Sequence, residues 1–519
     1  MSNSSWRSAE SGKEHKPSKG LSDRSLAALK WNYAGVAVKV ISQLIIGIVL
    51  ARLLGPEPFG LFAITLLVTG VGSIVVEMGL GSALVQKEVV TEEDIRAVFT
   101  RLMLTGVAMA CLAILGANWI AGLFNDARLG PVLIGGAIFL VFQSFGVVSA
   151  SLLKRDLEIR TVQVGQVASY LIGFLGVGVT MALLGFGVWS LIAALISQSF
   201  IFTVMMYLKV RHPIKPLLRA DTSHVNKFGY RVALTNLANW TIENMDNFLV
   251  GKFFGMNALG LYSISYNLVR TPTNHVMTTV QTVLFPASAR AQKNNESIQR
   301  AYLATLGIVT LVILPTFAGV AAVSGTVVEA LYGQKWVEAI PLLLPLALAM
   351  PIHAAMTGSV ILWGKGLVGL ELRVQFWIAI VFVLTLLAAS RISLIAMAWG
   401  VFIVYFLRCA WLTKEILRSI HLPWARFGLA VRGGLLLGIV AFIVLAGADR
   451  LLITLGVIPQ IRLSVEIMLG MLVLVSIPVL FARFVLSPDV IWLLDKIVHK
   501  LPARLQSLFR RYVRATPST

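Results

Sequence analysis

Long apolar segments constrain this chain more than any other feature. Runs of about 20 or more predominantly apolar residues recur from the thirties to the mid-480s of the 519-residue sequence. The hydrocarbon core of a bilayer is about 30 Å thick, and an α-helix crosses it with about 20 residues. With 57% hydrophobic and only 13% charged side chains, the chain has too little polar surface for a water-soluble globule. We predict an all-α integral membrane protein.

The apolar runs predict about fourteen transmembrane helices. Several are longer than a perpendicular crossing requires, so we expect them to be tilted or to extend beyond the bilayer. The predicted spans are residues 31–53, 58–85, 97–124, 130–153, 161–184, 187–208, 229–254, 258–288, 301–323, 339–363, 368–389, 392–412, 429–447 and 463–485.

A net charge of +20 could indicate a protein that binds nucleic acid. The positions of the Lys and Arg residues along the chain decide between this and a membrane protein. If the N-terminus is cytoplasmic, most Lys and Arg residues fall in the tails and in the loops of that side, while Lys39, Arg270 and Arg408 lie within spans. This is the positive-inside bias of membrane proteins. The basic clusters at 211–219 and 504–514 therefore indicate a membrane surface and exclude nucleic acid as a partner. The polar, basic first thirty residues do not resemble a cleavable signal peptide, so both termini are expected in the cytoplasm.

The sequence contains one phrase twice. "LLGPEPFGLFAI" at 53–64 and "FFGMNALGLYSI" at 253–264 are offset by 200 residues, each between the first and second span of a half. The offset covers an even number of spans, so the halves have the same orientation and form parallel repeats. Gly55 and Gly255 are expected to end a helix.

The repeat predicts two six-helix lobes around a central cavity, an arrangement typical of transporters that work by alternating access. The resulting organisation is a cytoplasmic basic tail (1–30), an N-lobe (31–210), a cytoplasmic linker (211–227), a C-lobe (228–418), two further spans (419–485) and a cytoplasmic amphipathic tail (486–519).

"ARLLGPEPFGLFAI" (51–64) followed by "EMGLGSALVQK" (77–87) resembles the opening of Wzx-type polysaccharide flippases. These belong to the multidrug/oligosaccharidyl-lipid/polysaccharide exporter superfamily, and the likeness is to the branch for lipopolysaccharide, exopolysaccharide or teichuronic acid. The resemblance implies a flippase in the bacterial inner membrane that moves an undecaprenyl-diphosphate-linked oligosaccharide to the outer leaflet. It also implies membrane lipid, a polysaccharide polymerase and export machinery as partners.

The seventh predicted span carries the richest polar face. Its polar residues follow helical spacing on an otherwise apolar helix, so they cannot face lipid. Two interpretations remain open, namely that this face lines a cavity or that it forms a structural hydrogen-bonded seam against a neighbouring helix. Glu243 and Asp246 are candidates for binding a coupling ion, with a structural ion-pair role as the alternative. The face consists of Asn236, Asn239, Trp240, Glu243, Asp246 and Asn247.

The first span has an equivalent polar line. Lys39 aligns with Asn239 and Gln43 with Glu243 at the offset of 200 residues. Lys39 and Glu77 lie at similar depth on adjacent antiparallel helices, so they can form a structural ion pair. The alternative is that Lys39 contacts a phosphate and Glu77 releases it when the anionic headgroup arrives.

Arg270 supplies an intramembrane cation in the second half, suited with Lys39 to a diphosphate. Asn274 is a candidate for donating to sugar hydroxyls or for satisfying the backbone near Pro272. Arg408 is interpreted as snorkelling to the interface, with a cavity role as the alternative.

Span 10 contains three prolines, which predict a bend. His353, which follows Pro351, is interpreted as a core histidine rather than a proton-coupling group.

Enzymatic activity, cofactors and metals are not expected. No paired metal-ligand arrangement of histidines and no phosphate-binding loop of the Walker type occurs in the sequence. The remaining alternatives are a multidrug cation antiporter of the same superfamily and a membrane glycan polymerase or ligase. A cation pump favours unpaired carboxylates, whereas Lys39 and Arg270 suit an anionic headgroup.

Overall fold

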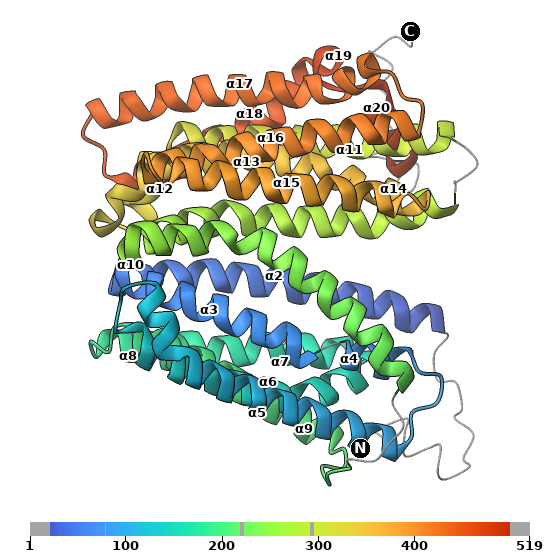
Figure 1. Ribbon diagram of the computed structural model, residues 1–519. Helices are drawn as coiled ribbons and strands as arrows, with labels where there is room; N and C mark the ends of the chain where they lie inside the picture. The colour runs from blue at the N-terminus through green and yellow to red at the C-terminus, as the bar shows by residue number, and fades with distance from the viewer. Residues whose placement is uncertain (1–20, 78, 218–222, 291–294, 499–519) are drawn as a thin grey trace. The chain divides into compact units, whose positions relative to one another are not determined.

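A computed structural model describes residues 21–77, 79–217, 223–290 and 295–498, and within these ranges every regular element is helical (Figure 1). The all-α membrane fold class is confirmed. The chain forms two compact units, Met1–Ser263 and Ile264–Thr519. Each unit is described by itself, and the lobe boundaries inferred from the repeat stay a prediction.

The helices of the first unit follow the first six predicted spans. Span 2 is broken at Gly79 (φ 70°), and span 5 contains a π-helix that apolar periodicity did not predict. The elements are α2 (Leu21–Leu54), α3 (Pro56–Glu77), α4 (Leu80–Gln86), α5 (Glu92–Leu123), α6 (Leu129–Arg155), α7 (Ile159–Tyr170), the π-helix η1 (Leu171–Gly178), α8 (Val179–Leu183) and α9 (Val188–Val210).

The second unit contains predicted spans 9 to 14, whereas span 7 belongs to the first unit and span 8 is divided between the two. Helix α13 runs through Pro345 and Pro351 without a break, and span 10 is interrupted only at the 3₁₀ turn η3, so the bend predicted from the prolines stays a prediction. The elements are α11 (Asn295–Ala322), α12 (Ser324–Leu331), η2 (Gln334–Ala339), α13 (Ile340–Ala355), η3 (Met356–Gly358), α14 (Ser359–Gly364), α15 (Val368–Ala389), α16 (Leu394–Ser419), α17 (Trp424–Thr454), α18 (Pro459–Leu480), α19 (Ala482–Val485) and α20 (Pro488–Val498).

The long helix α10 (Ser223–Arg290) covers the predicted spans 7 and 8. It is two helices joined at Gly255, whose backbone (φ 81°, ψ −178°) is not helical. The structure has twelve helices within the described residues that are long and apolar enough to cross a membrane, and α10 is not one of them. The predicted count of fourteen spans therefore stays a prediction.

The repeated phrase forms a reciprocal contact inside the first unit. A Cβ placed on Gly60 would lie 1.8 Å from the carbonyl oxygen of Met256, and one on Gly260 would lie 1.9 Å from that of Pro56. Gly55 and Gly255, with φ of 83° and 81°, both adopt the conformation that only glycine takes without strain. The phrase occurs twice because each copy packs against the backbone of the other.

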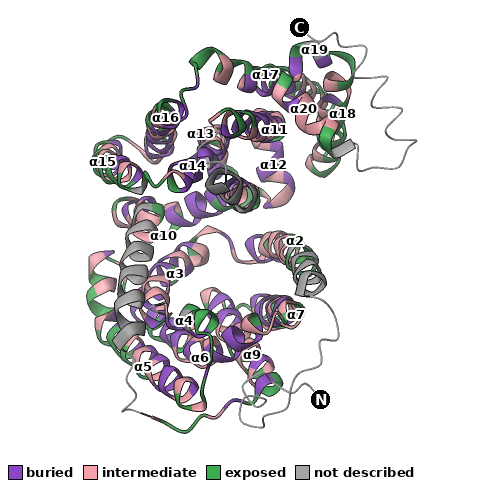
Figure 2. Ribbon diagram, turned by 90° about the vertical axis from the view of Figure 1, so that its right-hand side faces the viewer, coloured by how far each residue is buried: buried purple, intermediate pink, exposed green. Residues whose placement is uncertain are grey.

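Two apolar clusters hold the helices of the first unit together. One joins α3, α4, α5, α6 and α9 around Val76, Leu84 and Phe99, and the other joins α2, α3 and α9 with the π-helix around Leu50 and Phe174. Figure 2 looks along the helices and shows α2, α3, α6, α7 and α9 standing around a common centre.

Small residues allow close helix crossings in both units, as is usual in membranes. In the first unit a Cβ on Gly106 would lie 2.5 Å from the Ser144 side chain. In the second unit a Cβ on Gly434 would lie 2.5 Å from the Thr310 carbonyl oxygen, which packs α17 tightly on α11.

Candidate functional site

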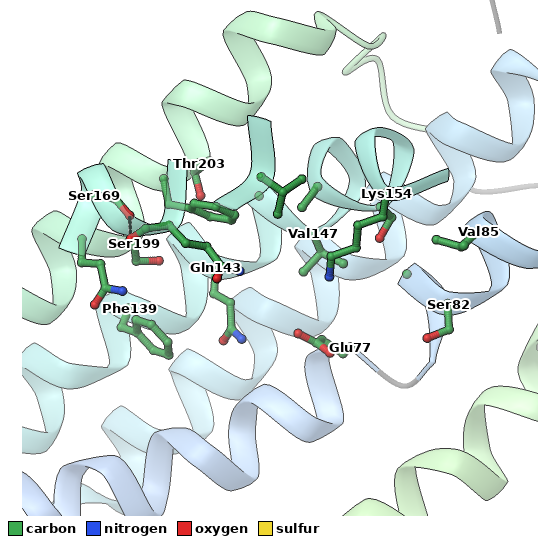
Figure 3. Close-up of a pocket in the computed structure, with 18 of the residues that line it drawn as sticks. Glu77, Ser82, Val85, Phe139, Gln143, Val147, Lys154, Ser169, Ser199 and Thr203 are labelled. Carbon is green, nitrogen blue, oxygen red and sulfur yellow. Dashed lines mark hydrogen bonds between the residues drawn. The ribbon is translucent and has the colours of Figure 1, made fainter. Parts of the chain in front are cut away.

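A cavity of about 480 Å³ lies among the helices of the first unit (Figure 3). Residues of α2, α3, α4, α6, α7 and α9 line it, together with Gly79 of the turn that breaks span 2. Its volume falls within the range of roughly 300–1,000 Å³ typical of ligand sites. The polar lining residues are Lys39, Glu77, Ser82, Gln143, Ser151, Lys154, Gln166, Ser169, Gln198, Ser199 and Thr203.

The cavity is a polar interior between apolar walls. Val162, Val147 and Phe202 of its lining belong to or pack on the cluster around Leu84, whereas Leu195 and Phe139 belong to or pack on the cluster around Leu50. Amides and hydroxyls buried within membrane-crossing helices are costly unless they meet each other, water or a ligand. Their concentration here therefore indicates a binding site.

Lys39 projects from α2 towards α7. Its Nζ lies 3.4 Å from Oε1 of Gln166, at the long limit of a hydrogen bond. Two turns earlier on α2, Asn32 accepts a 2.8 Å hydrogen bond from Gln163 of α7. These contacts attach α2 to α7 and hold the Lys39 ammonium at the cavity wall.

Glu77 and Lys154 face the same cavity from α3 and α6 (Figure 3). Glu77 is the last residue of α3, just before the Gly79 turn, and Lys154 belongs to the last turn of α6. The predicted Lys39–Glu77 ion pair is not formed in the described part of the chain. The reason is that Lys39 turns to Gln166, while Lys154 occupies the cationic position near Glu77.

The residue after Lys154 fixes the wall of the cavity. The Arg155 guanidinium donates to the backbone carbonyls of Leu84, Lys87 and Glu88, with an N–O distance of 2.6 Å to Glu88. These carbonyls close the C-terminal end of α4, where a helix leaves its acceptors unpaired. Arg155 thus anchors the segment that carries Gly81, Ser82 and Val85 of the lining.

The polar face predicted for span 7 does not contribute to this cavity within the described residues. The side chains of Asn236 and Asn239 lie outside the described part of the chain. Trp240 packs on α3, since a Cβ on Gly70 would lie 2.8 Å from its Nε1. Glu243 is exposed on α10, and Gln43 is half-buried on α2, outside the described lining.

Asp246 is engaged in a hydrogen-bonded seam. It is 1% exposed, and its carboxylate accepts a 2.8 Å hydrogen bond from the Tyr262 hydroxyl and another of 2.8 Å from the Asn247 backbone. Tyr262 belongs to the repeated phrase and is fully buried. These contacts match the structural alternative for span 7 at this residue.

Arg270 and Asn274 are half-buried on the part of α10 that belongs to the second unit. The Arg270 guanidinium lies 5.2 Å from the centre of the Tyr266 ring, and the Tyr266 hydroxyl lies 2.6 Å from that of Tyr405. His353 stacks on Tyr405 with ring centres 5.1 Å apart, as expected of a core histidine. Arg270 therefore belongs to an aromatic cluster of the second unit.

Several lining residues escaped prediction. In the sequence, Lys154 is one of two adjacent basic residues at the end of a span. Nothing in the sequence distinguishes Lys154, which lines the cavity, from Arg155, which does not. Gln143, Gln166 and Gln198 are intramembrane amides, and that property was the signal that could have identified them. Gln143 and Gln198 each stand alone in their spans, and Gln166 is preceded by Gln163 in the same span, so no local pattern indicated that α6, α7 and α9 bring the three amides together.

The arrangement suits an anionic, hydroxyl-rich ligand. With two lysines and one glutamate as its charged lining residues, the cavity carries a net positive charge. Lysines bind phosphate as point charges, and amides and hydroxyls exchange hydrogen bonds with sugars. No group of side chains suited to a metal ion occurs within the described residues.

Comparison with known proteins identifies the family to which the chain belongs. Residues 49–341 match the family model described as polysaccharide biosynthesis protein, which is more than half of the sequence. The chain belongs to this family.

Three bacterial relatives are similar to this family member over much of its length. The teichuronic acid biosynthesis protein TuaB of Bacillus subtilis is 28% identical over 66% of this chain and 73% of its own length. The succinoglycan biosynthesis transport protein ExoT of Rhizobium meliloti is 27% identical over 59% and 62%. The lipopolysaccharide biosynthesis protein WzxC of Escherichia coli is 20% identical over 62% and 66%.

Solved structures show the same fold. The lipid II flippase MurJ in an inward closed conformation aligns with a TM-score of 0.66 and 13% identity, covering 88% of this chain and 99% of MurJ. An inward-facing multidrug resistance transporter of the MATE family aligns with a TM-score of 0.58 and 15% identity, covering 73% and 95%. At these identities the likeness establishes an all-α transporter fold.

Proposed function

We propose that this family member is a flippase for a lipid-linked oligosaccharide. In this proposal an undecaprenyl-diphosphate-linked glycan passes from the cytoplasmic to the outer leaflet by alternating access. The observation that carries the proposal is the cavity of the first unit, where Lys39 and Lys154 outnumber Glu77 among amides and hydroxyls. Family membership and the names of the relatives, which refer to teichuronic acid, succinoglycan and lipopolysaccharide, support the same substrate class.

The charge of the cavity favours this substrate over the alternatives. Two ammonium groups attract a diphosphate, whereas a cationic drug would meet repulsion from both. A volume of about 480 Å³ accommodates a diphosphate and the first sugars but not the lipid tail. A polymerase or ligase, the other alternative, would form a new glycosidic bond, whereas the cavity groups serve to bind and orient. We therefore infer a transporter rather than an enzyme.

The proposed setting is the bacterial inner membrane with both termini in the cytoplasm. The positive-inside distribution of Lys and Arg supports this orientation. Polysaccharide polymerase and export machinery are the proposed partners. Arg270 and Asn274 are proposed to contact the same substrate from the second half.

Ion coupling through Glu243 and Asp246 is a further part of the proposal. The two carboxylates differ in their surroundings, because Asp246 is bonded to Tyr262 while Glu243 is exposed. Glu243 is therefore the better placed of the two to exchange an ion with water. If the coupling role is right, Glu243→Gln will abolish the response of transport to an imposed ion gradient, whereas Glu296→Gln will not.

The decisive test is transport of undecaprenyl-diphosphate-linked oligosaccharide in proteoliposomes. We expect native protein to move the glycolipid, and Lys154→Gln and Lys39→Gln each to reduce the initial rate by at least about tenfold, the effect of losing one charge-assisted hydrogen bond. Lys209→Gln is the matched control, because Lys209 is exposed at the end of α9 and outside the described lining.

Two outcomes would overturn the proposal. One is native protein that leaves the glycolipid in its original leaflet but exports a small cation. The other is transport that tolerates Lys39→Gln and Lys154→Gln as well as it tolerates Lys209→Gln. The second result would leave the proposed substrate class unchanged but would show that the cavity takes no part in transport.

A further inference from the structure

A second group of charged side chains lies in the hairpin of α17 and α18, far along the sequence from the transport cavity. Four residues form it, and it combines one cation with three carboxyl groups. Arg462, in the first turn of α18, is 7% exposed, and Glu466 follows one turn later. Asp449 lies near the end of α17, and Glu329 belongs to α12. Three separate elements therefore bring these charges together.

The single cation is shared by two of the carboxylates. The Arg462 guanidinium lies 2.9 Å from Oε2 of Glu329 and 4.0 Å from Oδ1 of Asp449. The same oxygen of Asp449 accepts a 2.5 Å hydrogen bond from the Thr326 hydroxyl of α12. Glu329 is thus paired closely, whereas Asp449 has only a distant ion pair and one hydroxyl.

Glu466 has no such donor. It is 2% exposed, and neither of its carboxyl oxygens receives a hydrogen bond from any described residue. Glu466 lies one turn after Arg462 on the same face of α18, and Arg462 lies 4.0 Å from Asp449, so the carboxyl groups of Glu466 and Asp449 are neighbours. Two carboxylates are both acceptors, so a hydrogen bond between them requires a proton on one of them.

The surroundings of Glu466 also disfavour a charge. Glu466 lies at the wall of a groove of about 260 Å³ whose described lining is otherwise apolar apart from Thr316 of α11. No other titratable or charged side chain of α11 or α12 lines this groove, and Arg462 is the cation nearest to Glu466 on α18. An isolated carboxylate in such a place would lose its hydration without compensation.

We propose that Asp449 and Glu466 form a proton-binding site in which the two carboxyl groups share one proton. A proton fits better than a metal ion, because the Arg462 guanidinium occupies the neighbouring position and repels a cation. No metal-binding group occurs within the described residues either. The site is independent of the proposed glycolipid transport and of Glu243 and Asp246. Deprotonation would place two adjacent anions beside Glu329, so the site couples the packing of α12, α17 and α18 to pH.

Infrared spectroscopy of the full-length protein in lipid nanodiscs tests the proposal. The spectrum of native protein minus that of Glu466→Gln should show the C=O stretch of a protonated carboxylic acid at about pH 7, where ordinary Asp and Glu side chains are ionised. The band should disappear at strongly alkaline pH. Asp449→Asn should also remove it, because the amide N–H replaces the shared proton and leaves Glu466 ionised.

A chemical measurement on native protein covers the case in which these variants fail to fold. Dicyclohexylcarbodiimide modifies protonated carboxyl groups in apolar surroundings. Mass spectrometry should locate the adduct on Glu466 or Asp449 at about pH 7 and should find it reduced at least several-fold at about pH 10. Glu296 is the internal control, because it is exposed and pairs with Arg300, so it should stay unmodified.

Three results would overturn the proposal. The first is a difference spectrum without the protonated-acid band. The second is a band that Asp449→Asn leaves unchanged. The third is modification that sodium suppresses at constant pH, which would identify a metal ion as the ligand in place of the proton.

Discussion

Lys154 and Arg155 are adjacent cations with separate roles. Successive residues of a helix point about 100° apart, so only one of the two can face the cavity. Lys154 lines it beside Glu77, and Arg155 reaches the carbonyls at the end of α4. A lysine presents a compact charge to a ligand, and an arginine presents several fixed donors to several carbonyls. Each side chain therefore suits its own surroundings, with Lys154 at the cavity and Arg155 at the end of α4.

Gly60 should be among the most sensitive positions of the chain. We expect Gly60→Ala to lower the free energy of unfolding by about 1–3 kcal/mol, because the new Cβ would collide with a backbone carbonyl that cannot rotate away. Gly260→Ala should have a similar effect through Pro56. Thermal unfolding in detergent measures both.

Gly47→Ala is the control for this pair, because no atom lies within 4 Å of the position that its Cβ would take. Alanine favours a helix over glycine by up to about 1 kcal/mol, so Gly47→Ala should be neutral or stabilising. Equal melting temperatures for Gly47→Ala and Gly60→Ala would contradict the proposed close packing.

His212 should make the protein less stable in mild acid. It lies in the segment after α9, 1% exposed, between the rings of Phe99 and Tyr207, and burial lowers the pKa of its imidazole. A lowered folded-state pKa means that the unfolded chain takes up the proton first as the pH falls below about 6.5. Stability due to His212 is therefore present above this pH and is lost below it.

The measurement is the melting temperature of the detergent-solubilised protein at about pH 7.5 and about pH 5.5. His212→Gln should show a smaller decrease than native protein, because glutamine cannot take up a proton. His421→Gln, which changes an exposed histidine, should keep the native decrease. A decrease of the same size in all three proteins would exclude His212 as the cause.

Individual side chains were only partly predictable. Lys39 and Glu77 were identified because a charge within an apolar run is rare, and both line the cavity. That the two do not pair with each other in the described part of the chain was not predictable, because Gln166 and Lys154 approach from other helices. Asp449 was missed because it falls between the predicted spans 429–447 and 463–485, whereas α17 continues to Thr454. Glu466 lies within the last predicted span, and no pattern indicated a partner for it.

Among the described helices, α10 is the longest, and it contains a buried polar contact across its break. The bond from Tyr262 to Asp246 joins residues on the two sides of the Gly255 break. We expect Tyr262→Phe to cost about 1.5–3 kcal/mol of unfolding free energy, because it removes the hydroxyl donor from a buried carboxylate. Tyr262→Phe combined with Asp246→Asn should cost less than the sum of the two single changes.

Tyr302→Phe is the matched control for this experiment. The Tyr302 hydroxyl is buried in α11 without a hydrogen-bond partner among the described residues, so its removal should be neutral or stabilising. A Tyr262→Phe variant as stable as Tyr302→Phe would show that the bond contributes nothing to α10.

Helix existence was predictable from hydropathy, and helix irregularity was predictable only where backbone chemistry demanded it. The helix ends at Gly55 and Gly255 were predictable, since glycine adopts a positive φ without strain. The π-helix Leu171–Gly178 had no such signal. Its position depends on Gly173, whose Cβ would lie 2.8 Å from the Ala194 carbonyl oxygen of α9.

For the chain as a whole, the proposed orientation can be tested by cysteine labelling. A background with alanine at Cys111 and Cys409 removes both natural thiols. Gln460→Cys, at the exposed start of α18, should react with an impermeant maleimide added to intact cells. Lys215→Cys, exposed in the segment after α9, should react only after the membrane is permeabilised. The reverse pattern would invert the topology.

The arrangement of the two halves that the repeat implies stays a prediction, and the packing of the chain was not predictable. An even number of spans between the two phrases implied parallel halves without any contact information. That the two phrases meet at Gly60 and Gly260 depends on how α10 folds back on α3, which no local pattern encodes. The cavity is a further result of packing, because its lining comes from several separate helices.

The reciprocal glycine contact has a consequence for the history of the sequence. Each phrase supplies a glycine and also the backbone that the glycine of the other copy touches, so a change in one copy affects the packing of both. The same surface would also pair two identical half-length chains about a twofold axis. A gene duplication followed by fusion would preserve that ancestral dimer contact. The two phrases should then have stayed alike while the rest of the halves diverged.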